Sequence, residues 1–114
     1  MPEPAAVDVD PEDAKLITLA RATRARLGAV EGAAVRDDTG RTYTGAPVAL
    51  PSLSLTGLQV AVATALSSGA HSLEAAAVVG DSGELPEADV RLLADLGAPP
   101  VLLAGPDGTI RERG

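Results

Sequence analysis

The chain contains no cysteine, phenylalanine or tryptophan, and each absence limits what the protein can be. Without cysteine it can form no disulfide, no thiolate nucleophile and no thiolate zinc site. Tyr43 is the only aromatic residue, so the core must be built from Ala, Val, Leu and Ile, which bury less area than aromatic side chains. Association with another subunit is one way to make up the missing burial.

Positive charge and long apolar runs are also scarce. The 114 residues include 9 Lys and Arg against 16 Asp and Glu, a net charge of -7 without any basic run, which argues against nucleic-acid partners. The longest apolar stretches reach about ten residues, too short to span a bilayer, so we expect no membrane insertion. The acidic N-terminus lacks the features of a signal peptide. We therefore expect a cytoplasmic protein.

Apolar spacing, caps and turn residues predict three helices and five strands in one domain. The expected helices are 11–27, 55–68 and 86–96, and the expected strands are 32–37, 41–46, 73–79, 101–104 and 109–113. Residues 1–9, rich in proline and acids, are expected to be a disordered tail before a single domain over 10–114. Pro47 and Pro51 indicate an irregular connection. This order predicts an α/β protein with helices packed over a mixed sheet.

The second expected helix is apolar around almost its whole circumference. A helix of this kind has to be covered on nearly every side, and one sheet face covers only about half of it. A second layer or a neighbouring subunit must cover the rest. We therefore expect a homodimer or homotetramer, with Leu58, Val62 and Leu66 as candidate interface residues.

Several segments resemble the cytidine deaminase family. Residues 16–27 resemble its first helix, and 32–35 with 38–45 resemble its first hairpin. Pro86 and Arg91 stand where the family has the proline and arginine of its Pro-Cys-x-x-Cys-Arg motif. The resemblance covers roughly residues 14–110. It implies a three-layer α/β/α fold with a five-stranded mixed sheet and three helices.

The same alignment shows that the chemistry of that family is missing. The family's Cys-Ala-Glu falls on Thr56-Gly57-Leu58, and its two later cysteines fall on Glu87 and Val90. In the family these residues bind a zinc ion, which activates water, while the glutamate moves the proton. Leu58 and Val90 have no lone pair to offer. We therefore expect no metal, no cofactor and no catalytic residue.

The family's substrate contacts have changed as well. Its glutamate and asparagine that bind the ribose fall on Pro47 and Val48, which cannot make the same polar contacts. The resemblance thus defines a set of degenerate pocket positions: Pro47, Val48, Thr56, Leu58, Glu87 and Val90.

The remaining polar residues give weaker signals. His71, the only histidine, is expected at the C-terminal end of the second helix, away from the family's pocket. Four carboxylates gather in sequence around the third helix start and would suit a hard cation, but they lack a recognisable ligand spacing: Asp81, Glu84, Glu87 and Asp89. Acids at a helix start are also expected from the helix dipole.

The sequence leaves two hypotheses open, with a third that its residues oppose. The first is a catalytically inactive deaminase-like protein acting as an oligomeric scaffold or as an interaction module for an unknown protein partner. The second is a non-catalytic binding module for a nucleoside-like or apolar metabolite, in a remodelled pocket. The third, active cytidine deamination, needs a metal site and a proton shuttle that the chain lacks.

Overall fold

The computed structural model describes residues 9–113, and residues 1–8 of the expected tail lie outside the described part. Its elements are α1 (Pro11–Leu27), β1 (Glu31–Asp37), β2 (Thr42–Gly45), β3 (Val48–Leu50), β4 (Leu53–Leu55), α2 (Gly57–Ser67), β5 (Leu73–Gly80), α3 (Glu87–Asp95), β6 (Val101–Ala104) and β7 (Ile110–Arg113). The three helices and the five strands expected from the sequence are all present, with small differences at their ends.

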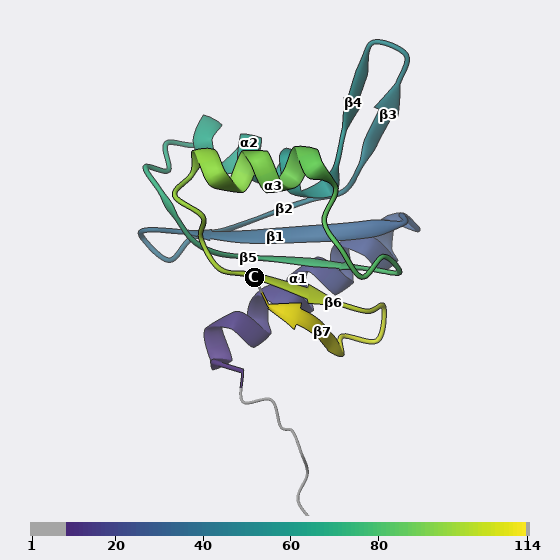
Figure 1. Ribbon diagram of the computed structural model, residues 1–114, viewed down its shortest axis with the longest axis horizontal. Coiled ribbons are helices and arrows are strands. Elements are labelled where there is room, and N and C mark those ends of the chain that lie inside the picture. The colour runs from purple at the N-terminus through teal and green to yellow at the C-terminus, as the bar shows by residue number, and fades with distance from the viewer. Residues whose placement is uncertain (1–8, 114) are drawn as a thin grey trace, which may run out of the picture.

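Five strands form one mixed sheet in the order β2-β1-β5-β6-β7. The central pair β1 and β5 is antiparallel, β5 and β6 are parallel, and both edge strands are antiparallel to their neighbours. Helix α1 lies on one face of the sheet, and α2 and α3 lie on the other (Figure 1). The predicted three-layer α/β/α fold is confirmed.

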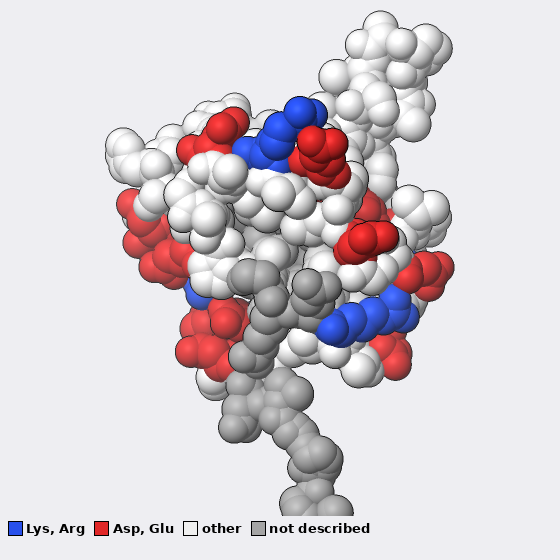
Figure 2. Space-filling model, viewed as in Figure 1, with Lys and Arg blue, Asp and Glu red and all other residues white. Residues whose placement is uncertain are grey.

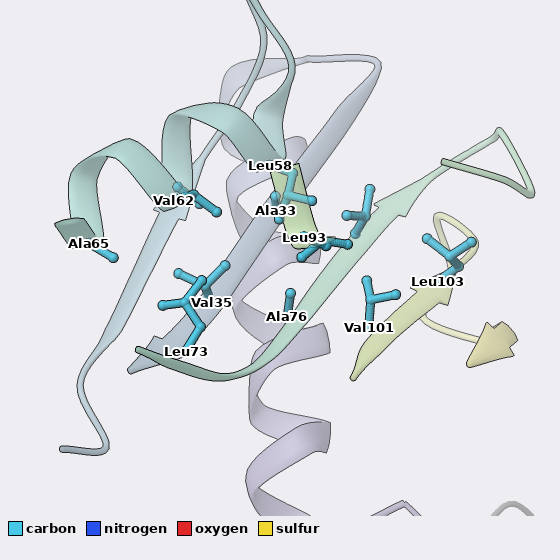
Figure 3. Close-up of a cluster of buried hydrophobic side chains, with 12 residues drawn as sticks. Ala33, Val35, Leu58, Val62, Ala65, Leu73, Ala76, Leu93, Val101 and Leu103 are labelled. Atoms are coloured by element: carbon cyan, nitrogen blue, oxygen red, sulfur yellow. The ribbon is translucent and has the colours of Figure 1, made fainter. Parts of the chain in front are cut away.

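Alternation along the central strands produces two separate cores. Ala33 and Val35 of β1 face α2 and α3, whereas Ala34 between them faces α1. The same alternation in β5 sends Ala76 to one side and Ala77 to the other. The α2 and α3 side is the larger core, and Figure 3 shows Leu58, Val62 and Leu93 from the helices above the sheet residues.

Glycines let the helices approach the sheet closely. A Cβ atom at Gly32 would clash with the backbone carbonyl of Ala20 in α1. On the opposite face, a Cβ atom at Gly45 would lie 2.6 Å from the backbone nitrogen of Ala61 in α2. Small residues in the sheet therefore let α1 and α2 pack close to it. This close packing makes up for part of the contact area that aromatic side chains would otherwise supply.

The connection expected to be irregular is instead a β-hairpin. Strands β3 and β4 pair in an antiparallel two-stranded sheet, with Val48 opposite Leu55 and Leu50 opposite Leu53. The hairpin projects beyond the layer of α2 (Figure 1). The prolines at 47 and 51 misled the prediction: they lie just before β3 and in the turn, where no ladder hydrogen bond from their nitrogen is needed.

Two of the three candidate interface residues are used inside the chain. Leu58 is 0% exposed and Val62 is 2% exposed, both in the core between α2 and the sheet. The prediction that they contact a neighbouring subunit is therefore wrong, because the sheet and α3 cover more of α2 than one sheet face alone. Leu66 is 44% exposed and stays a candidate.

Candidate functional site

The start of α2 is held by a complete capping box. The Thr56 hydroxyl accepts a hydrogen bond from the Gln59 backbone N–H at 3.0 Å, and the Gln59 side chain accepts one from the Thr56 N–H at 2.9 Å. The two residues thereby satisfy backbone donors that an α-helix leaves free at its N-terminus. Thr56, which stands at the family's first ligand position, is thus a structural cap.

The same hydroxyl joins α2 to the start of α3. Thr56 Oγ1 donates a hydrogen bond to Asp89 Oδ1 at 2.7 Å, and Asp89 is only 1% exposed. The sequence places Glu87 and Val90 at the family's cysteine positions, but it is the residue between them that reaches Thr56. The two helix starts are therefore connected by a direct hydrogen bond between side chains.

The second carboxylate oxygen of Asp89 has no partner. Oδ2 is buried without a hydrogen bond in the described structure. Burial raises the pKa of Asp89, and the hydrogen bond from Thr56 opposes this rise only in part. The site thus favours the protonated, neutral form of this acid more than water does.

A second carboxylate reaches the α2 start from the sheet. The Gly57 N–H donates a hydrogen bond to Glu31 Oε2 at 2.7 Å, from the first residue of β1. A carboxylate at a helix N-terminus is stabilised by the free N–H groups and by the helix dipole. Sequence analysis missed Glu31, because the contact joins residues 26 positions apart and no local pattern indicates it.

The predicted pocket residues differ widely in how far they are exposed. Leu58 lies in the core, as described above, and Val90 is 52% exposed. Glu87 is exposed and faces Arg91, at 3.9 Å between Oε2 and Nη1. Pro47 and Val48 are half-buried near the base of the hairpin. Thr56 caps α2 and Leu58 lies in its first turn, while Glu87 and Val90 lie in the first turn of α3, so these four positions stay at the two helix starts that the resemblance implied.

The donor atoms at the two helix starts do not fit the zinc ion of the resembled family. A catalytic zinc site takes three protein ligands, normally His, Cys or a carboxylate. Here the chain has no cysteine, and the hydroxyl of Thr56 is committed to two hydrogen bonds. The exposed His71 lies beyond the opposite end of α2. Among the side chains that the structure describes, those of residues 9–111, no group of three His, Cys, Asp or Glu is placed to hold a metal.

A cavity of about 290 Å³ lies beside this region, at the ends of β1, β5 and β6. Its apolar part includes Val78, Leu103 and Pro86, while Glu31 and Glu84 contribute carboxylates. Its volume is near the lower limit of pockets that hold small molecules. None of the residues around it belongs to the six degenerate pocket positions, although Asp81 and Glu84 are two of the four carboxylates that the sequence analysis considered for a cation.

Comparisons with solved structures agree with the topology. The chain is similar to the cytidine deaminase of Burkholderia pseudomallei, with a TM-score of 0.77 and 24% identity over 88% of this chain and 89% of that one. For the cytidine deaminase of Mycobacterium leprae the TM-score is 0.68, with 24% identity over 91% and 95% of the two chains. The enzyme of Mycobacterium tuberculosis is 28% identical, with a TM-score of 0.60 over 92% of this chain and 91% of that one.

A comparison with protein families matches most of the chain to one family. No curated protein matches it. None of the helices in residues 9–113 has the length and apolar character needed to cross a membrane. The family described as cytidine deaminase-like matches residues 9–108. The chain therefore belongs to the cytidine deaminase-like family.

Proposed function

We propose that this chain is a non-catalytic member of its family that works by binding, as an oligomeric scaffold or a protein-interaction module. The observation that carries the proposal is the hydrogen bond between Thr56 and Asp89. It connects the starts of α2 and α3 directly, where a member with the complete motifs would need ligands for a metal. The two helix starts thus have a direct structural connection.

The position of the proton shuttle supports the same proposal. Leu58 stands where the family has its glutamate, and it is fully buried among Ala33, Val62 and other core residues. Its side chain contributes to the packing of α2 on the sheet and has no acid–base group. A water molecule activated at this place would have no side chain on α2 to accept its proton.

A metal and activity assay tests this proposal. The protein is purified from zinc-supplemented medium, its zinc content is measured by mass spectrometry, and ammonia release from cytidine is followed. The Mycobacterium tuberculosis cytidine deaminase, treated in parallel, is the positive control. We expect zinc well below one equivalent and no ammonia above the rate without protein. One equivalent of zinc together with ammonia release would show that the proposal is wrong.

A second candidate function, binding of a small molecule without turnover, is favoured by the 290 Å³ cavity beside Glu31. A ligand that binds only the folded state raises its melting temperature by an amount that grows with the logarithm of ligand concentration above Kd. Nucleosides, bases and apolar metabolites would therefore be screened by thermal shift. A true ligand should lose its effect in Val30→Trp, which places a larger side chain beside the cavity, and keep it in Leu27→Trp, outside the lining. No shift with any compound would count against this function.

A further inference from the structure

The cavity beside Glu31 lies where one end of the sheet meets the loop from β5 to α3. Strand β1 begins at this end and strands β5 and β6 finish there, as Figure 1 shows. Glu31 and Gly80 stand opposite each other in the antiparallel pair of β1 and β5. A Cβ atom at Gly80 would lie 2.9 Å from the Val30 carbonyl oxygen, so the close approach of the two strands needs a glycine here. Paired strands therefore form one part of the cavity wall, and the loop forms another.

Apolar side chains make up most of this wall. They come from five of the lining residues: Val30, Val78, Leu85, Pro86 and Leu103. A wall of this kind favours a ligand with an apolar body, because binding removes apolar surface of both partners from water. The volume of about 290 Å³ limits that body to a small one.

The charged groups around the cavity are acidic. Glu31, Asp81 and Glu84 belong to its lining, and no Lys, Arg or His is among the described lining residues. None of the ion pairs within residues 9–111 includes one of these three acids. Figure 2 shows acidic side chains, with positive charge beside them, on the right of the molecule, where the loop from β5 to α3 lies in Figure 1. Arg111 donates a hydrogen bond to the Asp81 carbonyl oxygen at 2.7 Å, so its charge balances Asp81 and leaves Glu31 and Glu84 uncompensated.

Glu31 is held in position by the start of α2. Its Oε2 accepts the hydrogen bond from the Gly57 N–H, while its Oε1 accepts none from another residue of the described part. The first bond orients the carboxylate before a ligand arrives, which lowers the entropy that is lost on binding. Oε1 is therefore free to accept a hydrogen bond from a ligand.

We infer that this cavity binds a small organic cation, a primary amine or a guanidine carried by a compact apolar body. A positively charged donor forms a charge-assisted hydrogen bond with a carboxylate, which is stronger than a bond between neutral groups. The net charge of -7 also attracts cations to the molecule and repels phosphates and carboxylates. This inference rests on the second candidate function, binding without turnover, and names the ligand class for it.

Ligands of nearly equal shape and different charge test the inference on the full chain. Benzylamine and phenylguanidine are cations at neutral pH, benzyl alcohol is neutral and benzoate is an anion. Each is titrated at constant ionic strength, and amide NMR shifts give both the dissociation constant and the residues affected. The two cations should bind about tenfold more tightly than benzyl alcohol, and benzoate should bind more weakly still. The shifts should be concentrated at residues 30–31, 78–86 and 103, which contain the lining.

Matched variants separate the charge of the carboxylates from their role in the fold. Glu31→Gln keeps a side-chain oxygen for the Gly57 N–H and should remove most of the preference for benzylamine over benzyl alcohol. Glu84→Gln, at an exposed residue, should reduce this preference less. Asp95→Asn removes an exposed carboxylate of α3 outside the lining and should leave both affinities unchanged. Urea unfolding checks that each variant is folded.

The outcomes distinguish this inference from the function on which it rests. Benzyl alcohol or benzoate bound at the lining as tightly as the cations would overturn the cationic ligand class, while the binding function would stand. Cations that shift acidic residues all over the surface, or that keep their full preference in Glu31→Gln and Glu84→Gln, would overturn the site. No binding of either cation would overturn the inference as a whole, and the thermal-shift screen would still test the binding function with other compounds.

Discussion

Two regions of this protein contain a buried aspartate, and the two aspartates differ in the number of hydrogen bonds that they accept. At the turn between β1 and β2, Asp37 is 2% exposed and accepts four hydrogen bonds, from the Thr39 N–H and hydroxyl, the Arg41 N–H and the Tyr43 hydroxyl. Between the starts of α2 and α3, Asp89 is 1% exposed and accepts one hydrogen bond, from Thr56. The first carboxylate is fully satisfied, and the second is not.

The two regions differ in how completely they satisfy a buried carboxylate with hydrogen bonds. Hydrogen bonds from four donors make the ionised form of Asp37 an integral part of the hairpin turn. Asp89 lies between the starts of α2 and α3, and its Oδ2 has no hydrogen-bond partner among the described residues. Buried polar groups without partners are uncommon in folded proteins, because each lowers the stability of the fold. Asp89 therefore destabilises its region, whereas Asp37 in the turn does not.

The largest effect is expected from returning the family's glutamate to α2. Leu58→Glu places a carboxylate in a core where the leucine is 0% exposed. Burial of an unpaired charge is strongly unfavourable, so this variant should be unfolded or acquire no stable tertiary structure. Leu58→Met, a swap of similar volume, should cost less than about 1.5 kcal/mol. Near-ultraviolet signals are weak with one tyrosine, so amide NMR dispersion and urea unfolding are the measurements. A well-folded Leu58→Glu protein would mean that position 58 opens into a hydrated site.

The next effect concerns the link between the two helix starts. Thr56→Ala removes both the cap of α2 and the partner of Asp89 Oδ1, and should cost about 1–2 kcal/mol in the free energy of unfolding. Thr56→Ser keeps the hydroxyl and should cost less than half as much. Urea denaturation of the three proteins measures both differences. Equal losses in the Ala and Ser variants would show that the methyl group, and not the hydroxyl, stabilises this region.

The fold was more accessible from sequence than the site. Local chemistry marks both ends of α1: the Asp10 side chain caps its start, Pro11 is its first residue, and Gly28 ends it in the left-handed conformation. The apolar run before Gly80 indicates a central strand buried on both faces, as β5 is. These features depend on neighbours in sequence, so periodicity and caps are sufficient to predict them.

The site depends on contacts between distant residues, which explains what the sequence did not reveal. Glu31 meets Gly57, and Thr56 meets Asp89, across separations of 26 and 33 residues. A family motif assigns positions one by one, and it pointed to Glu87 and Val90, whereas the rotation of α3 brings Asp89 to Thr56. A shift of one residue on a helix turns a side chain by about 100 degrees, which is enough to exchange a buried position for an exposed one.

Asp37, the fully hydrogen-bonded carboxylate, should contribute to the stability of the fold at acidic pH. Burial alone would raise the pKa of Asp37, but the hydrogen bonds from Thr39, Tyr43 and Arg41 outweigh it and lower the pKa from 3.8 to about 2. Because the folded-state pKa is the lower one, the stabilisation by Asp37 is present above pH 3.8 and is lost as the pH falls towards 2. Tyr43→Phe removes one donor and should raise the pKa of Asp37, which carbon-detected NMR titration measures. An unchanged pKa would show that the Tyr43 hydroxyl does not contribute.

The unsatisfied carboxylate should have the opposite pH dependence. Burial raises the folded-state pKa of Asp89 above its ordinary value of 3.8, so the folded protein holds this proton more tightly than the unfolded chain does. Its contribution to stability therefore falls as the pH rises from 3.8 through the folded-state pKa, and the cost persists at neutral pH. Asp89→Asn keeps an oxygen for Thr56 and cannot ionise, so it should gain about 1 kcal/mol at pH 7 and little at pH 3.5. Urea unfolding of both proteins from pH 3.5 to 8 measures the difference, with the exposed Asp95→Asn as the control. A gain that does not change with pH would mean that ionisation of Asp89 is not what distinguishes this region from the turn at Asp37.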